Sequence, residues 1–317
     1  MSADAGHKQR KYFLDNLRSF IILLVVVFHV AMGYVTWDIE WWYVNDSQKN
    51  PFFDLFILAT DVYIMPIMFF IAGYFAFPAL IVKGAAEFVR DKIRRIGLPW
   101  IAGVLFIAPV IAYSAIFSRT DTPPNFFAFW ENKFFGAYYQ QAHYWFLGIL
   151  FLFFLLLVLV YQLAPAYFRQ PLRTRIPSGA FFPLFALLSA APFFVANLFF
   201  ASDLWVNANY LFMIQPVRIG LYLCYFGLGI YAWKNNWFTR EGYQPKLFPW
   251  GLSAIILLFV FLAYRVTFTF GATVSTLFKA GHALAYAVFC LSATFALLAL
   301  FQRFADSNSY LWRRLAA

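Results

Sequence analysis

Residues 14–33, LDNLRSFIILLVVVFHVAMG, decide the fold, because this run is apolar enough to cross a bilayer and still contains Asp15, Arg18 and His29. Arg18 and His29 are eleven residues apart, and on a helix that spacing leaves them about 20° apart on one face. They are separated by ~16 Å along the axis, about half the hydrocarbon thickness of a bilayer. Ionisable groups at such depths are costly and mark substrate pathways or proton relays, so this pair is the first candidate for a functional site.

The composition is that of a membrane protein, with 63% hydrophobic and only 12% charged residues. The net charge of +10 would suggest a nucleic-acid partner in a soluble chain, but here it follows from the positive-inside rule, and we expect no nucleic acid. Cys224 and Cys290 lie in apolar stretches, and the histidines are scattered at positions 7, 29, 143 and 282. No metal-ligand spacing results, so neither a metal site nor a structural disulfide is expected.

Stretches long and apolar enough to span a membrane predict an all-α, polytopic transmembrane bundle forming one domain over residues 1–317. The eight candidate spans are residues 13–36, 51–80, 98–118, 143–165, 180–202, 210–232, 249–270 and 275–301. The second is long enough to be tilted or broken near Pro66. The basic N-terminus has no cleavage site near the first run, which indicates a retained membrane helix.

Lys and Arg are abundant in every second connection and rare in the others, and this distribution predicts the orientation of the chain in the membrane. The N-terminus, residues 81–97, 166–179 and 233–248 and the tail hold 17 of them, whereas the other connections hold only Lys49, Arg119 and Lys133. Basic residues are retained on the cytoplasmic side, so both ends of the chain are expected there.

The outer connections, residues 37–50 and 119–145, are rich in Trp, Tyr and Phe. Aromatic residues of this kind form the interfacial belt of membrane proteins. Their faces also offer apolar contact area on which a sugar ring can stack. Both roles can hold together, and the sequence leaves both open.

Asp54 and Asp61 are seven residues apart, hence on one helix face, and lie at a level similar to that of His29. A contact between His29 and one of these aspartates would raise the basicity of the imidazole and fix its tautomer, as a general base requires. The alternative is that each aspartate forms a structural ion pair with Arg218 or Arg265. His282 is expected to be an ordinary buried histidine.

The segment before the third span concentrates cations, among them Lys92, Arg94 and Arg95. It could serve only as an anchor on anionic lipid. It could instead bind phosphate together with Arg18, because the arginine fork donates two parallel hydrogen bonds to phosphate oxygens.

Four stretches, in this order, resemble the acyltransferase-3 family of polytopic membrane O-acyltransferases. They are Arg18, ten residues and His29 in the first span; MPIMFFIAGYF at 65–75; Lys92-Ile93-Arg94-Arg95, similar to an Arg-x-x-Arg motif but with lysine first; and HYWFLGILF at 143–151. The patterns around LDNLR and MPIMFFIAG are most similar to glucan-modifying, succinyltransferase-like members. The family typically has ten spans, so the resemblance implies that the last spans are missing here.

The resemblance implies an enzyme of the bacterial cytoplasmic (inner) membrane, an acyltransferase transferring groups other than aminoacyl groups. The donor would be cytoplasmic acyl-CoA (acetyl-CoA or succinyl-CoA), and the acceptor a hydroxyl of an extracytoplasmic polysaccharide or glucan. The implied donor-binding residues are Arg18, Lys92, Arg94 and Arg95, and the implied catalytic residues are His29, Asp61 and Asp54. Direct transfer is favoured over an acyl-histidine intermediate.

A competing interpretation is a proton-coupled transporter or flippase that uses the same intramembrane Arg, His and Asp groups. It predicts proton movement coupled to substrate and no binding of acyl-CoA. The two halves of the chain show no visible repeat of the kind many transporters have. A purely structural membrane scaffold would have no need of the Arg18–His29 pair.

Overall fold

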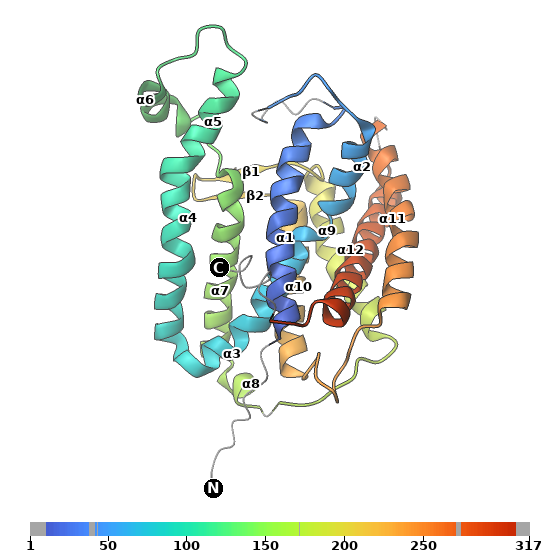
Figure 1. Ribbon diagram of the computed structural model, residues 1–317. Helices are drawn as coiled ribbons and strands as arrows, with labels where there is room; N and C mark the ends of the chain where they lie inside the picture. The colour runs from blue at the N-terminus through green and yellow to red at the C-terminus, as the bar shows by residue number, and fades with distance from the viewer. Residues whose placement is uncertain (1–10, 38–41, 43, 171, 271–273, 309–317) are drawn as a thin grey trace.

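The computed structural model describes residues 11–37, 42, 44–170, 172–270 and 274–308. In this part of the chain nearly all regular structure is helical, with one short antiparallel hairpin, as the predicted all-α bundle requires (Figure 1). The helices run roughly along one common direction, and the hairpin lies near the end at which α5 and α2 are drawn.

The first half of the chain contains α1 (Tyr12–Ala31), α2 (Pro51–Thr60), α3 (Ile64–Lys92), α4 (Leu98–Ala102), α5 (Ala108–Phe117) and α6 (Phe126–Phe129). The second half contains α7 (Trp145–Leu163), α8 (Pro165–Arg169), α9 (Phe181–Phe199), β1 (Val206–Ala208), β2 (Phe212–Ile214), α10 (Pro216–Lys234), α11 (Leu247–Phe270) and α12 (Thr276–Phe304). Two π-helical turns, Ile93–Gly97 and Gly103–Ile107, connect α3, α4 and α5 without leaving the helical conformation.

Six helical stretches are long and apolar enough to cross a membrane: Tyr12–Tyr34, Pro51–Phe117, Ala142–Leu163, Phe181–Phe199, Leu247–Thr267 and Thr276–Phe304. The 67-residue stretch contains the second and third predicted spans. It is interrupted at Gly84, whose φ of 74° only glycine adopts easily, and Figure 1 shows the chain reversing direction between α3 and α4. The break expected near Pro66 lies just before it, at residues 61–63, and Pro66 occupies the first turn of α3, where its missing N–H is tolerated.

The sixth predicted span coincides with α10, which carries Arg218 and Lys234 and is not among those six stretches. This helix packs against α3 backbone to backbone at two glycines. A Cβ on Gly73 would collide with the carbonyl oxygen of Phe226, and a Cβ on Gly229 with that of Phe70. The two glycines therefore permit a reciprocal close approach, which membrane helices use to pack tightly.

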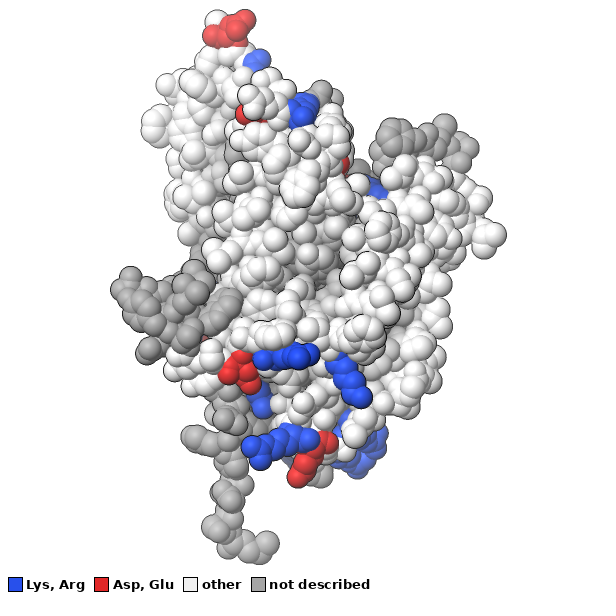
Figure 2. Space-filling view, turned by 45° about the vertical axis from the view of Figure 1, so that its right-hand side comes forward, with Lys and Arg blue, Asp and Glu red and all other residues white. Residues whose placement is uncertain are grey.

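Charged residues gather at the two ends of the molecule and leave an apolar zone between them. Figure 2 shows Lys and Arg concentrated at the lower end, with a smaller charged group at the top. Large apolar side chains such as Val26, Leu156 and Phe259 are exposed in between. We call the end that carries the connections 81–97 and 233–248 the basic end, and the end that carries the connection 119–145 the aromatic end.

Candidate functional site

His29 lies in the last turn of α1, at the aromatic end, and its ring is half-buried. Its Nδ1 is 2.7 Å from the carbonyl oxygen of Val25. A carbonyl oxygen can only accept, so Nδ1 donates and carries the hydrogen. In the neutral ring the lone pair is therefore on Nε2, which is the arrangement that a general base requires.

Two other rings hold His29 in place. The ring of His143 stands edge-on, with its centroid 4.1 Å from that of His29 and an angle of 75° between the planes. The ring of Trp42 stacks on His29 at 5.5 Å. Trp42 is 5% exposed, and its carbonyl oxygen accepts a hydrogen bond of 2.5 Å from the guanidinium of Arg119. We call His29, His143 and Trp42 the histidine cluster; it joins α1 to two outer connections.

Asp54 does not reach this cluster; it binds the chain that leaves α1. Its Oδ1 accepts from the backbone N–H of Thr36 at 2.8 Å, and its Oδ2 accepts from the Thr36 hydroxyl at 2.5 Å. Asp54 stands in the first turn of α2, where the helix dipole favours a carboxylate. The carboxylate thus ties the N-terminus of α2 to the end of the first span.

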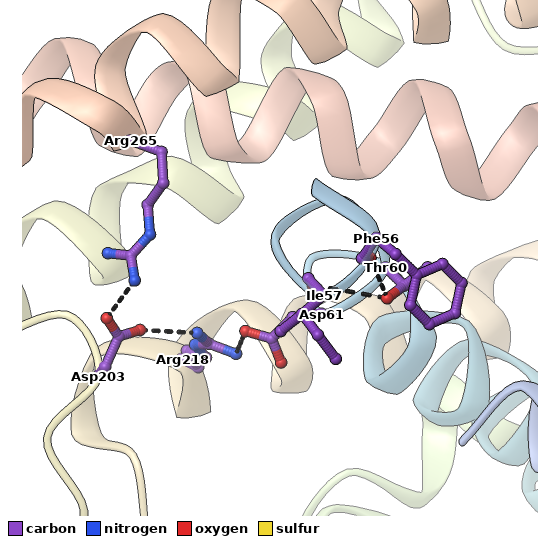
Figure 3. Close-up of polar contacts among 7 residues, drawn as sticks. All are labelled: Phe56, Ile57, Thr60, Asp61, Asp203, Arg218 and Arg265. Carbon is purple, nitrogen blue, oxygen red and sulfur yellow. Dashed lines mark hydrogen bonds and ion pairs between the residues drawn. The ribbon is translucent and has the colours of Figure 1, made fainter. Parts of the chain in front are cut away.

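Asp61, just after α2, takes part in a network of four charges (Figure 3). Its Oδ2 lies 2.6 Å from the guanidinium of Arg218, which also lies 3.0 Å from Asp203, and Asp203 in turn lies 2.5 Å from Arg265. The Arg218 side chain is only 7% exposed, whereas Asp61 and Asp203 keep 33% and 49% of their side-chain surface accessible. We call these residues the four-charge network; it is neutral overall and joins elements that are distant in sequence.

The pairing of Asp61 with Arg218 is the ion-pair alternative that the sequence left open for the aspartates. Asp203 supplies the partner of Arg265. Burial by itself would raise the pKa of Asp203, but the guanidinium groups of Arg265 and Arg218 outweigh that effect and hold it below its usual value.

Arg18 lies nearer the basic end of the same helix as His29, with its side chain 42% exposed and 3.8 Å from Asp15. Ile22 and Val26, which lie between Arg18 and His29 in the sequence, are 49% and 58% exposed. The edge of α1 between the cation and the imidazole is therefore apolar and accessible.

The cations at the end of α3 are organised around Asp91. Arg95 and Lys83 lie 3.0 and 3.1 Å from its carboxylate, while the ammonium of Lys92 stands 4.5 Å from the ring centroid of Phe154 on α7. Arg94 is exposed. Arg18 pairs with Asp15, and Arg95 pairs with Asp91. Donor binding by Arg18, Lys92, Arg94 and Arg95 together remains a prediction.

The sequence did not single out His143, Trp42 or Asp203. His143 stands in the stretch HYWFLGILF, which was used only for its resemblance to a family motif, and Asp203 is the only charged residue in the run from 176 to 217; both were available signals. His282 is 1% exposed, as expected, and packs near the rings of Phe193 and Phe261. The described residues contain no group of three or more His, Cys, Asp or Glu side chains that could hold a metal ion.

The chain has recognisable relatives among known proteins. Residues 11–316 match the model of a family described as an acyltransferase domain. Among curated proteins, the chain is similar to the glucans biosynthesis protein C of Salmonella paratyphi B, Salmonella heidelberg and Salmonella enteritidis PT4, each 27% identical over 143 residues. The matched region covers 44% of this chain and only 36% of each relative. No solved structure matches significantly.

Proposed function

Because the chain belongs to the acyltransferase-3 family, we propose that it moves an acetyl or succinyl group from cytoplasmic acyl-CoA to a hydroxyl of an extracytoplasmic glycan. The observation that carries this proposal is the lone pair on Nε2 of His29, at the aromatic end of a helix whose other end carries Arg18. The name of the relatives supports a glucan as the acceptor. We place the protein in the bacterial cytoplasmic membrane as one domain.

On the acceptor side, His29 acts as the general base of a direct transfer. The acceptor hydroxyl gives its proton to Nε2 while its oxygen attacks the carbonyl carbon of the thioester. The carbon–sulfur bond then breaks, and the departing thiolate takes the proton back from the imidazole and leaves as a thiol. The imidazole is neutral at the start and at the end, and no further reactant is needed.

On the donor side, Arg18 binds phosphate at the basic end, with Lys92, Arg94 and Arg95 adding positive charge around it. Arg18 and His29 lie ~16 Å apart by helical rise. A long donor molecule can follow the exposed apolar edge formed by Ile22 and Val26, with its anionic part at Arg18 and its thioester near His29. This arrangement explains why a cation and a base share one helix face.

The direct test is acyl transfer by the detergent-purified protein, comparing His29→Ala with Val30→Ala as a matched control. Val30 is the neighbouring residue and is 61% exposed, so its truncation leaves the site and the packing unchanged. His29→Ala should abolish turnover and retain the melting temperature and acyl-CoA binding. Turnover at the wild-type rate in His29→Ala would contradict the mechanism.

A measurement of acyl-CoA binding distinguishes an acyltransferase from a transporter. We expect acetyl-CoA or succinyl-CoA to bind the wild type in calorimetry and to bind Arg18→Ala much more weakly. Arg18→Lys keeps the charge but loses the planar fork, so it should weaken the use of acyl-CoA more than the use of glycan. A protein that binds neither thioester, but moves protons together with a substrate, would support the transporter instead.

A further inference from the structure

The backbone immediately before His143 is strained. Ala142 has a φ of 44°, in the left-handed region that a residue with a Cβ rarely adopts. Such a conformation is unfavourable for a residue with a Cβ and persists only where the surrounding structure determines it. Strained residues are concentrated at functional sites, so the conformation of Ala142 points to a functional role for the segment around it.

The chain before Ala142 is fixed by buried hydrogen bonds. Gln141 is 1% exposed, and its side-chain amide donates to the carbonyl oxygen of Leu211 at 2.8 Å and to the hydroxyl of Tyr139 at 2.9 Å. The Tyr139 hydroxyl donates in turn to the carbonyl oxygen of Tyr210 at 2.6 Å. These bonds attach the segment to the turn between β1 and β2.

The chain after His143 is fixed by packing. The ring of Tyr144 fills the space at Gly103, where an added Cβ would collide with it. Trp145, the first residue of α7, stands edge-on to Trp205 at 5.2 Å. His143, between two anchored neighbours, is the exposed residue of this turn, and its ring reaches His29.

We propose that His143 is the acceptor-binding residue of the site and holds the glycan hydroxyl against Nε2 of His29. This inference rests on the proposed function and adds a second imidazole to it. Nδ1 of His29 donates to the carbonyl oxygen of Val25, so only Nε2 is left for the substrate. Nε2 can accept the proton of the acceptor hydroxyl, but a second group is needed to orient that hydroxyl. A neutral imidazole at His143 offers one donor and one acceptor to a sugar hydroxyl.

The contact between the two rings also fixes which of them carries charge. Two imidazolium cations with centroids 4.1 Å apart would repel strongly, so the pair holds at most one positive charge. His143 therefore stays neutral when His29 takes the proton of the acceptor. It binds the hydroxyl by hydrogen bonding, and Trp42, stacked on His29, keeps that ring in position.

The test compares His143→Ala and His143→Gln with Lys133→Ala, an exposed residue of the same outer connection. Rates are measured with the glucan varied at saturating acyl-CoA, and acyl-CoA binding and the melting temperature are measured beside them. We expect His143→Ala to raise the KM for the glucan about tenfold, because one hydrogen bond to the acceptor is lost. Binding of acyl-CoA should be unchanged. His143→Gln keeps a donor and an acceptor and should lose less. Free imidazole should restore part of the loss in His143→Ala, because the position is exposed, and Lys133→Ala should match the wild type.

An unchanged KM for the glucan in His143→Ala, with transfer still dependent on His29, would overturn this inference and leave the proposed function standing. A lowered melting temperature with no rescue by imidazole and no advantage of His143→Gln would assign His143 a structural role and overturn it too. If the wild type itself transfers nothing from either thioester, the proposed function fails, and the inference fails with it.

Discussion

The carboxylate of Asp61 lies 2.6 Å from the guanidinium of Arg218, so one of the two aspartates considered as a partner of His29 is paired with an arginine on α10. Arg218 is nearly enclosed by protein, and its second nitrogen binds Asp203. One cation thus satisfies carboxylates from the α2–α3 junction and from the connection after α9. This geometry favours a role for Asp61 in holding the aromatic end together, and its predicted catalytic role remains a prediction.

Replacing Arg218 should destabilise the fold. Arg218→Ala leaves two carboxylates with Arg265 alone, and breaking a buried ion pair costs about 3–5 kcal/mol, less here because water still reaches Asp61 and Asp203. Thermal unfolding in detergent should show a clearly lower midpoint. The double variant Asp61→Asn, Arg218→Ala restores the charge balance and should recover part of the loss; if it falls below Arg218→Ala, the network is not held by charge compensation.

Acid should weaken the same network through Asp203. Its pKa is held below the usual value, so its ionised form stabilises the folded state at pH values above the unfolded-state pKa of about 3.9. That stabilisation is lost as the pH falls through the lowered pKa of the folded state. We expect the melting temperature of the wild type to drop below about pH 4, whereas Asp203→Asn should start lower at pH 7 and drop less. Parallel curves for the two proteins would show that Asp203 does not contribute.

Asp54 and Thr36 should act as one unit. Asp54→Ala and Thr36→Val each remove the short hydrogen bond between the side chains, at a cost of about 0.5–1.5 kcal/mol, and Asp54→Ala also removes the bond to the Thr36 amide. The double variant should be no less stable than Asp54→Ala, which a double-mutant cycle measures directly. Fully additive losses would mean that the two residues stabilise the protein independently. A loss of turnover in Asp54→Ala far larger than in Thr36→Val, at equal melting temperatures, would instead support the predicted catalytic role of Asp54.

The packing of α3 on α10 should not tolerate a methyl group added at Gly229. A methyl group added at Gly227, two residues earlier, should be tolerated. A Cβ on Gly229 collides with the carbonyl oxygen of Phe70, whereas the space at Gly227 on the same helix is open. Gly229→Ala should lower stability by about 1–3 kcal/mol, and Gly227→Ala should be neutral or raise it by up to about 1 kcal/mol. Equal midpoints for the two variants would show that the helices separate at no cost.

The fold was largely predictable because membrane helices can be recognised from their local amino-acid composition. The runs around α1, α7, α9, α11 and α12 are predominantly apolar, and no tertiary contact is needed to recognise them. The interruption at Gly84 falls inside the connection predicted at residues 81–97. It was not predicted that the rest of this connection is helical, as the end of α3 and the turn Ile93–Gly97.

The site was predictable only where its geometry is local. Arg18 and His29 share a helix, so their spacing fixes their relative direction. The partner of His29 is His143, 114 positions along the chain, and no periodicity relates the two residues. The same applies to Asp203, which reaches Arg218 through an irregular connection.

The reciprocal contact of Gly73 and Gly229 has a consequence for biosynthesis. α10 carries Arg218 in its first turn, and an arginine within a membrane span raises the cost of releasing that span from the insertion machinery into lipid on its own. By the time α10 leaves the ribosome, α3 has already been made and offers a backbone surface onto which α10 fits, with Asp61 close by as a counter-ion for Arg218. We expect the first third of the chain to act as a docking template during insertion, so that Gly73→Ala lowers the yield of inserted protein.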